Sequence, residues 1–292
     1  MRLGKTKKLR FPDGSLSLQR RMLELEQALF IDLQRCCGCL DCKKICPTEA
    51  VSASDPVVED GTVIKHITID VNPETCIFCG QCAVICPTKA ISWRENNETV
   101  PNVITGGILP ALDESIEISV NECLIDCKLA CQSICPVDAL DVKSVSVDGE
   151  ERIVDVLIDR DRCFYCKKCE PVCPYGLISV KSARTGIISF NSRHCPPHCR
   201  ACTEVCPSGA IHLKDGRVEV DETICIYCLS CSIVCPEEKA LEVKRERIQG
   251  LTLHSQLWVE MQGKLVSPGA RIRLIGENTV KKRKRAFETR ID

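Results

Sequence analysis

The sequence predicts an α+β protein built from three tandem copies of one small unit. Six short cysteine runs recur along the 292 residues, and each of them ends in Cys-Pro. Short β-like stretches, rich in Ala, Ile, Leu and Val, alternate with these runs. Pairing the runs consecutively gives three expected units, each with two runs and the strands that flank them.

The composition favours several small units over one large core. Only 4% of the residues are aromatic, whereas 25 are cysteines, so sulfur chemistry is expected to hold the units together. The basic segment 1–10 is followed by charged residues rather than by the apolar stretch of a secretion signal. No later segment has the roughly 18 apolar residues that a membrane-spanning helix needs. We therefore expect a cytoplasmic protein that is not inserted into a membrane.

Four of the runs share the spacing C-x2-C-x2-C-x3-C-P, and the third and fifth have longer gaps but also four cysteines. The regular runs are Cys36, Cys39, Cys42, Cys46; Cys76, Cys79, Cys82, Cys86; Cys163, Cys166, Cys169, Cys173; and Cys225, Cys228, Cys231, Cys235. The irregular runs are Cys123, Cys127, Cys131, Cys135 and Cys195, Cys199, Cys202, Cys206. Structural zinc sites usually separate two cysteine pairs by a longer loop, and disulfides need an oxidising compartment. Both alternatives are therefore disfavoured.

The regular spacing resembles the cluster-binding motif of bacterial ferredoxins. The resemblance implies that the 24 cysteines of the six runs hold six [4Fe–4S] clusters, two in each ferredoxin module. It also implies that the fourth cysteine of a run binds the partner cluster. One cluster of the first module would then use Cys36, Cys39, Cys42 and Cys86, and the other Cys76, Cys79, Cys82 and Cys46. We expect the clusters of the irregular runs to differ in reduction potential from the others, because loop shape changes the hydrogen bonds to sulfur.

Pairing the runs consecutively divides the chain into three modules with flanking segments. The expected segments are an N-terminal basic and amphipathic arm (1–29), module 1 (30–95), a linker (96–114), module 2 (115–183), module 3 (184–247) and a small β-rich C-terminal arm (248–292). A nested arrangement, with one module inserted in another, stays open because the last three runs are almost equally spaced.

Several features lie outside the repeat. Cys37 belongs to no run and is interpreted either as a small neighbour of a cluster or as a redox-active thiol. The N-terminal arm contains a helix-like segment over 18–30, and the C-terminal arm suggests β-strands. Both arms are candidates for docking on a partner subunit. The basic run 281–285 does not predict nucleic-acid binding, because cysteines that bind metal as thiolates make the protein more acidic than its formal charge of −1.

The six runs together resemble the polyferredoxins of anaerobic archaea. That resemblance implies an electron-transfer subunit rather than an enzyme, and the sequence contains no P-loop or dinucleotide fingerprint. The implied partners are the catalytic subunits of a tungsten or molybdenum formylmethanofuran dehydrogenase, a heterodisulfide reductase or a methanogen hydrogenase. The CO2-reducing formylmethanofuran system of methanogenesis is the first expectation. A free multi-cluster shuttle, or a redox subunit of a hydrogenase, formate dehydrogenase or keto-acid oxidoreductase, is the alternative.

Overall fold

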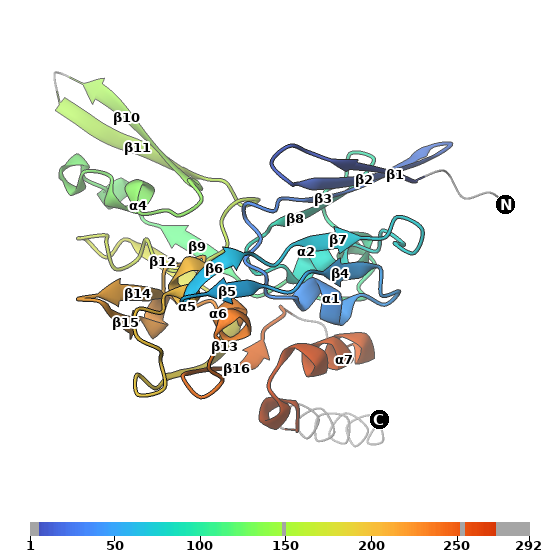
Figure 1. Ribbon diagram of the computed structural model, residues 1–292. Coiled ribbons are helices and arrows are strands. Elements are labelled where there is room, and N and C mark those ends of the chain that lie inside the picture. The colour runs from blue at the N-terminus through green and yellow to red at the C-terminus, as the bar shows by residue number, and fades with distance from the viewer. Residues whose placement is uncertain (1–5, 148–149, 252–254, 273–292) are drawn as a thin grey trace, which may run out of the picture.

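A computed structural model describes residues 6–147, 150–251 and 255–272 of the chain. It is an α+β structure in which short helices accompany antiparallel strands (Figure 1), as the sequence predicts. Five of the helices follow cysteine loops: α1 (Asp41–Ile45), α2 (Gln81–Ile85), α4 (Ala130–Ser133), α5 (Ala201–Glu204) and α6 (Ser230–Val234).

One pattern of strand pairing occurs three times along the chain. In each case the strand before the first cysteine run pairs with the strand after the second run, and the two inner strands pair with each other. Unit 1 (25–95) pairs β3 (Leu25–Ile31) with β8 (Ile91–Glu95) and β4 (Val51–Ala53) with β7 (Ile69–Val71). Unit 2 (115–181) pairs β9 (Ser115–Ile118) with β12 (Ile178–Lys181) and β10 (Leu140–Val147) with β11 (Glu150–Ile158). Unit 3 (184–248) pairs β13 (Arg184–Phe190) with β16 (Leu241–Ile248) and β14 (Ile211–Lys214) with β15 (Arg217–Val220). The pairing is thus consecutive rather than nested.

The N-terminal segment extends the sheet of unit 1. Strands β1 (Thr6–Arg10) and β2 (Leu16–Met22) join β3 and β8 in the order β1-β2-β3-β8, so the helix expected over 18–30 is wrong. Leu16, Ser17 and Leu18 are all buried, so both faces are covered at the start of β2. Strand pairing, rather than the local sequence pattern, holds this segment in an extended conformation. The described part of this arm packs on its own chain.

The C-terminal segment is mainly helical where it is described, over 256–265 and 268–272, so the β-rich extension expected there is also wrong. Helix α7 (Gln256–Leu265) begins at Ser255, whose hydroxyl accepts a hydrogen bond from the backbone N–H of Trp258 at 3.1 Å. Trp258, Met261 and Leu265 are buried at helical spacing. Residues 268–272 are helical as well. The basic run 281–285 lies outside the described residues, and no helix within them is long and apolar enough to cross a membrane.

The segment expected to be a linker takes part in the core beside α7. It contains helix α3 (Asn102–Thr105), and its Val103 and Leu109 are buried. They form one hydrophobic cluster with Ile45 of α1, Ile85 of α2 and Trp258 of α7. The segment between units 1 and 2 and the C-terminal segment therefore pack together against the helices of unit 1.

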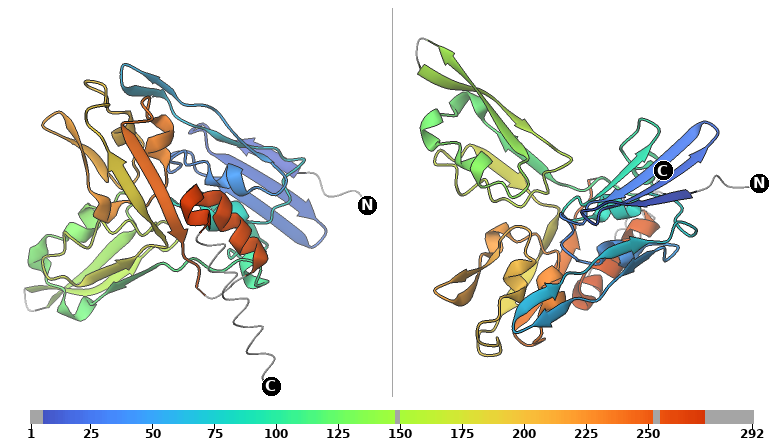
Figure 2. Two further views of the ribbon diagram at one scale, coloured as in Figure 1. Left: turned by 90° about the horizontal axis from the view of Figure 1, so that it is seen from below. Right: turned by 45° about the horizontal axis from the view of Figure 1, so that its top comes forward.

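The three units surround a common centre rather than lying in a row (Figure 2). Unit 2 projects from the other two through its hairpin β10–β11, and unit 1 meets unit 3 through the hairpin β5 (Val57–Glu59) and β6 (Thr62–Lys65), which contacts α5 (Figure 1). A small hydrophobic cluster at the centre joins all three: Cys39 of unit 1, Phe164 of unit 2 and Cys228 of unit 3 belong to it.

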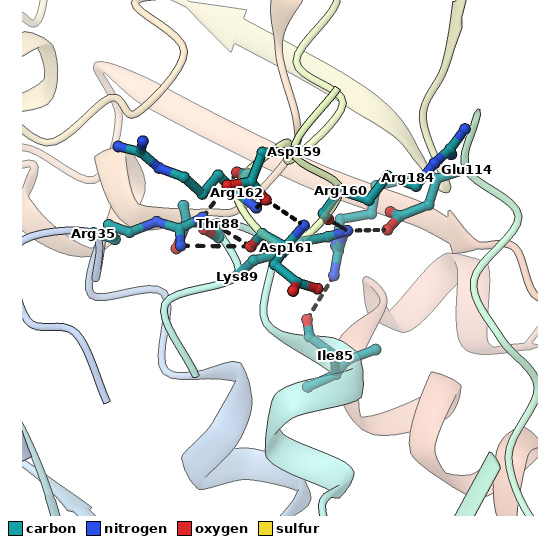
Figure 3. A network of polar contacts seen from close by, with 10 residues as sticks. All are labelled: Arg35, Ile85, Thr88, Lys89, Glu114, Asp159, Arg160, Asp161, Arg162 and Arg184. Atoms are coloured by element: carbon teal, nitrogen blue, oxygen red, sulfur yellow. Dashed lines mark hydrogen bonds and ion pairs between the residues drawn. The ribbon is translucent and has the colours of Figure 1, made fainter. Parts of the chain in front are cut away.

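Polar contacts join units 1 and 2 (Figure 3). The guanidinium of Arg35 donates to the carbonyl oxygen of Thr88 at 3.1 Å and to that of Arg162 at 2.8 Å. The ammonium of Lys89 donates to the carbonyl oxygen of Arg160 at 2.9 Å and lies 4.6 Å from the ring centre of Tyr165. These contacts bring the end of the second cysteine run against the start of the fourth.

Candidate metal centres

The four regular cysteine runs share one backbone shape. The second and fourth residues after the first cysteine have left-handed backbone angles in every one of them. These pairs are Gly38 and Leu40, Phe78 and Gly80, Tyr165 and Lys167, and Tyr227 and Leu229. Left-handed angles are uncommon for residues other than glycine and persist only where the surrounding structure imposes them. Alternating right- and left-handed residues turn successive backbone N–H groups toward one concave side, which is a common binding site for anions, including iron–sulfur clusters.

The folded chain brings the cysteine side chains together in six groups of four. Each group takes three cysteines from one run and the fourth cysteine from the other run of the same unit. Group 1 is Cys36, Cys39, Cys42 and Cys86; group 2 is Cys76, Cys79, Cys82 and Cys46; group 3 is Cys123, Cys127, Cys131 and Cys173; group 4 is Cys163, Cys166, Cys169 and Cys135; group 5 is Cys195, Cys199, Cys202 and Cys235; and group 6 is Cys225, Cys228, Cys231 and Cys206.

Three of these groups line cavities of similar size. All four cysteines of groups 2, 3 and 4 line a cavity in each case. The empty volumes of these cavities, which include space open to solvent, are ≈ 380 Å³ for group 2, ≈ 410 Å³ for group 3 and ≈ 360 Å³ for group 4. Apart from the sulfur atoms, the lining is mainly aliphatic and aromatic, with Val51, Leu29 and Phe78 around group 2. Within the described residues, no three His, Cys, Asp or Glu side chains approach closely enough to bind one metal ion. In groups 2, 3 and 4 the four cysteines line one shared space, which fits a polynuclear cluster.

Burial disfavours the thiolate form of the grouped cysteines. Burial, with smaller contributions from Cys86 and Cys39, raises the pKa of Cys36 to about 12. Burial and the neighbouring Cys199 and Cys235 raise the pKa of Cys202 to about 12. Metal ligands must be thiolates, so a cationic group within each set of four has to offset this burial and mutual repulsion. Iron ions supply such charge.

Backbone N–H groups already point at several of the fourth cysteines. Sγ of Cys46 accepts from the N–H of Ala50 at 3.2 Å, Sγ of Cys135 accepts from Ala139 at 3.2 Å, and Sγ of Cys173 accepts from Leu177 at 3.4 Å. In each pair the donor lies four residues after the cysteine, beyond the proline. Hydrogen bonds to ligand sulfur stabilise the thiolate and are one of the factors that set cluster potential.

The two irregular runs still join a group of four but have different loops. In the third run the left-handed residues are the adjacent Lys128 and Leu129, and in the fifth run His198 takes a left-handed angle directly before Cys199. The inward N–H pattern of the regular loops is therefore not repeated in these two. This difference is consistent with distinct potentials for the clusters of groups 3 and 5, which stays a prediction.

Cys37 lies at the meeting point of units 1 and 3. It is partly buried, and its thiol interacts with the sulfurs of Cys39 and Cys228. These interactions and burial raise the pKa of Cys37 well above its usual value, while the interaction with Cys37 lowers the pKa of Cys228. Cys37 is thus a partly buried thiol that does not belong to the six groups. It is a contact between group 1 and group 6.

The turn of the hairpin β5–β6 rests directly on group 5. Gly61 has a left-handed φ of +73°, and a Cβ at this position would lie 2.5 Å from Cα of Cys199. Its carbonyl oxygen accepts from the N–H of Arg200 at 2.8 Å, and the N–H of Val63 donates to the carboxylate of Glu204 at 2.7 Å. This contact joins a hairpin of unit 1 to the cysteine loop of unit 3.

We expect the substitution Gly61→Ala to destabilise this contact by about 2–3 kcal/mol, because the methyl group adds overpacking to left-handed strain. Gly216→Ala is a matched control, since Gly216 also lies in a hairpin turn, has φ +75° and has no atom within 4 Å of the added Cβ. The control substitution should lower the free energy of unfolding by about 1 kcal/mol. Thermal unfolding without oxygen, together with iron retention against a chelator, measures both variants. Equal effects of the two substitutions would contradict the steric contact with Cys199.

Comparisons with known proteins agree with this geometry. The 4Fe-4S dicluster domain family matches residues 35–100 and 185–239, and the LdpA Fe-S cluster-binding domain family matches residues 123–184. A chain of the "Formate dehydrogenase - heterodisulfide reductase - formylmethanofuran dehydrogenase complex from Methanospirillum hungatei" superposes with a TM-score of 0.74 at 25% sequence identity. The alignment covers 91% of this chain and 93% of that chain. The search of curated proteins found no match.

The fold and the cysteine groups define an iron–sulfur protein with domains of the 4Fe-4S dicluster type. More narrowly, the family matches and the superposed chain fit a polyferredoxin, as the sequence predicts. The 4Fe-4S cofactor class and an electron-transfer role are supported by the same matches.

Sequence reasoning missed one part of this region. Asp41 and Arg245 form a buried ion pair at 2.9 Å, with Asp41 between two cysteines of group 1 and Arg245 on β16 of unit 3. The two residues are separated by about two hundred positions, and no motif links them. The only signal in the sequence is the acidic residue inside the first cysteine loop.

Proposed function

We propose that this chain is an electron-transfer subunit that holds six [4Fe–4S] clusters, one in each cysteine group. The 24 cysteines of the six groups would be the ligands, with the fourth cysteine of each run serving the partner cluster of its unit. A [4Fe–4S] cluster, when bound, supplies a one-electron carrier. The chain's residues exclude water from the groups, donate N–H groups to the sulfurs and fix the groups relative to one another.

The observation that carries this proposal is the convergence of groups 1, 4 and 6. Cys39 of group 1, Cys166 of group 4 and Cys228 of group 6 belong to the same central hydrophobic cluster, with Phe164 between the units. Within each unit the third cysteines of the two runs also interact, as Cys42 does with Cys82. Groups 2, 3 and 5, the other group of each unit, would then be the three outer ends of the electron path. Such an arrangement suits transfer between separate sites better than storage on one diffusible carrier.

The proposed partners are the catalytic subunits of a larger redox complex. The superposed chain belongs to a formate dehydrogenase, heterodisulfide reductase and formylmethanofuran dehydrogenase complex. We assign this chain the corresponding place in a complex of the formylmethanofuran dehydrogenase type. The sequence provides no candidate for substrate chemistry, so this subunit would serve reactions carried out by its partners.

Purification from the source without oxygen tests this proposal. We expect about 24 iron atoms and about 24 sulfides per chain, and co-elution with tungsten- or molybdenum-containing subunits. Elution of the chain alone would exclude the complex and favour a free shuttle. Zinc, or an iron content far below this value after full reconstitution, would exclude the six clusters. Co-elution with a hydrogenase or keto-acid oxidoreductase would replace the proposed partner.

A further inference from the structure

A buried charge cluster lies where unit 1 meets unit 3, outside the cysteine groups themselves. Asp41 is fully buried, and Arg245 and Arg184 are 1% and 5% exposed. The carboxylate of Asp41 forms an ion pair with Nη1 of Arg245 at 2.9 Å, and it also interacts electrostatically with Arg184. Two guanidinium groups thus share one fully buried carboxylate, which leaves a surplus positive charge in the interior.

Arg245 is held in this position by backbone groups from separate elements. Its Nε donates to the carbonyl oxygen of Tyr227, in the loop of group 6, at 2.8 Å. Its Nη1 donates to the carbonyl oxygen of Leu265, at the end of α7, at 3.2 Å. The N–H of Ser267 donates to the carbonyl oxygen of Arg245 at 2.8 Å. The guanidinium is therefore fixed between the loops of groups 1 and 6 and covered by the C-terminal segment.

Apart from Asp41, the anionic neighbours of this cluster are Glu114, which interacts with Arg184, and cysteines of groups 1 and 6. Arg245 interacts electrostatically with the sulfurs of both Cys39 in group 1 and Cys228 in group 6. In the described residues, Nη2 of Arg245 and Nε of Arg184 have no hydrogen-bond partner. Burying an uncompensated cation costs several kcal/mol. Clusters with thiolate ligands in groups 1 and 6 carry negative charge and would offset that cost.

We infer that Arg245 is a positioning residue for electron transfer between units 1 and 3, and that its charge raises the reduction potentials of the clusters in groups 1 and 6. This inference rests on the proposed function, because it needs clusters in these groups. An added electron makes a cluster more negative, so a nearby fixed cation stabilises the reduced state. The negative charge of Asp41 would lower the same reduction potentials. The charge of Arg245 would make the two inner clusters of this contact preferred positions for the electron.

Substitutions at the two residues should shift the potentials in opposite directions. Arg245→Gln should reduce the reduction equilibrium constant of the two clusters by about tenfold, which corresponds to about 59 mV for one electron. Asp41→Asn should increase it by a similar factor. The double variant Asp41→Asn with Arg245→Gln removes one charge of each sign and should return the potentials toward the wild-type values. Arg245→Lys keeps the charge and should shift them least.

A redox titration followed by EPR, on the full chain prepared without oxygen, measures these shifts. Arg217→Gln is the control, because Arg217 is an exposed arginine on β15 of the same unit. The spin–spin interaction between the clusters of groups 1 and 6 should weaken in Arg245→Gln and persist in the control. Iron and sulfide are determined for every variant.

The inference fails if Arg245→Gln and Asp41→Asn shift the potentials in the same direction, or if all six clusters shift together, since both results indicate general disruption of the fold. It also fails if the double variant does not return toward wild type. Failure of the proposed function has a different signature, which is a low iron content in the wild-type protein itself. If Arg245→Gln does not fold, the difference in potential between the double variant and Asp41→Asn still gives the sign of the shift caused by Arg245.

Discussion

Two pairs of cysteine substitutions in unit 1 should remove different amounts of iron, although each pair contains two cysteines. Cys46→Ala combined with Cys76→Ala should leave about 20 of about 24 iron atoms, because both residues belong to group 2. Cys46→Ala combined with Cys36→Ala should leave about 16, because Cys36 belongs to group 1. Iron and sulfide analysis after anaerobic reconstitution measures the difference.

The reason is the position of Cys46 after helix α1. The helix Asp41–Ile45 carries the chain away from the first loop, and Cys46 lines the same cavity as Cys76, Cys79 and Cys82. Cys36 instead interacts with Cys86 and Cys39. If each run bound its own cluster, the two double variants would exchange their iron contents. A cluster that has lost one ligand can stay bound to the three remaining thiolates. In that case the single variants Cys46→Ala and Cys76→Ala should change the same EPR signal, that of the cluster in group 2.

The fold of the repeated units could be predicted because its determinants are local. The spacing of each run determines which cysteines share a loop, and the alternating apolar residues beside the runs predict strands. The grouping of Cys46 with Cys76 followed from resemblance to bacterial ferredoxins rather than from the spacing. The structure places these two thiols at one cavity.

The two ends of the chain could not be predicted in the same way. Over 18–30 the apolar residues suit a helix as well as a strand, and only pairing with β8 of a later segment decides for the strand. At the C-terminus, Trp258, Met261 and Leu265 are buried against residues from α1, α2 and α3, which lie more than 150 positions earlier. The same limit applies to Arg245, whose partner Asp41 is on another unit. Local pattern carries no information about such contacts.

Removal of the Trp258 side chain should give the largest loss of stability among single substitutions outside the cysteines. Trp258 is 4% exposed and belongs to the cluster that holds α7 against Ile45 and Ile85 of the unit 1 helices. We expect Trp258→Ala to cost about 3–5 kcal/mol, which for a chain of this size lowers the unfolding temperature by roughly 10 °C. Thermal unfolding without oxygen, followed by circular dichroism, measures it.

Lys264→Ala is the matched control, since Lys264 lies on the same helix and is exposed. It should leave the unfolding temperature within about 2 °C of wild type. The loss in Trp258→Ala should extend beyond α7 itself, because Leu265 accepts the hydrogen bond of Arg245 and because Ile45 and Ile85 directly precede Cys46 and Cys86. Groups 1, 2 and 6 should therefore release iron to a chelator faster than groups 3, 4 and 5. Equal release from all six groups would show that α7 stabilises the chain as a whole rather than the contact between units 1 and 3.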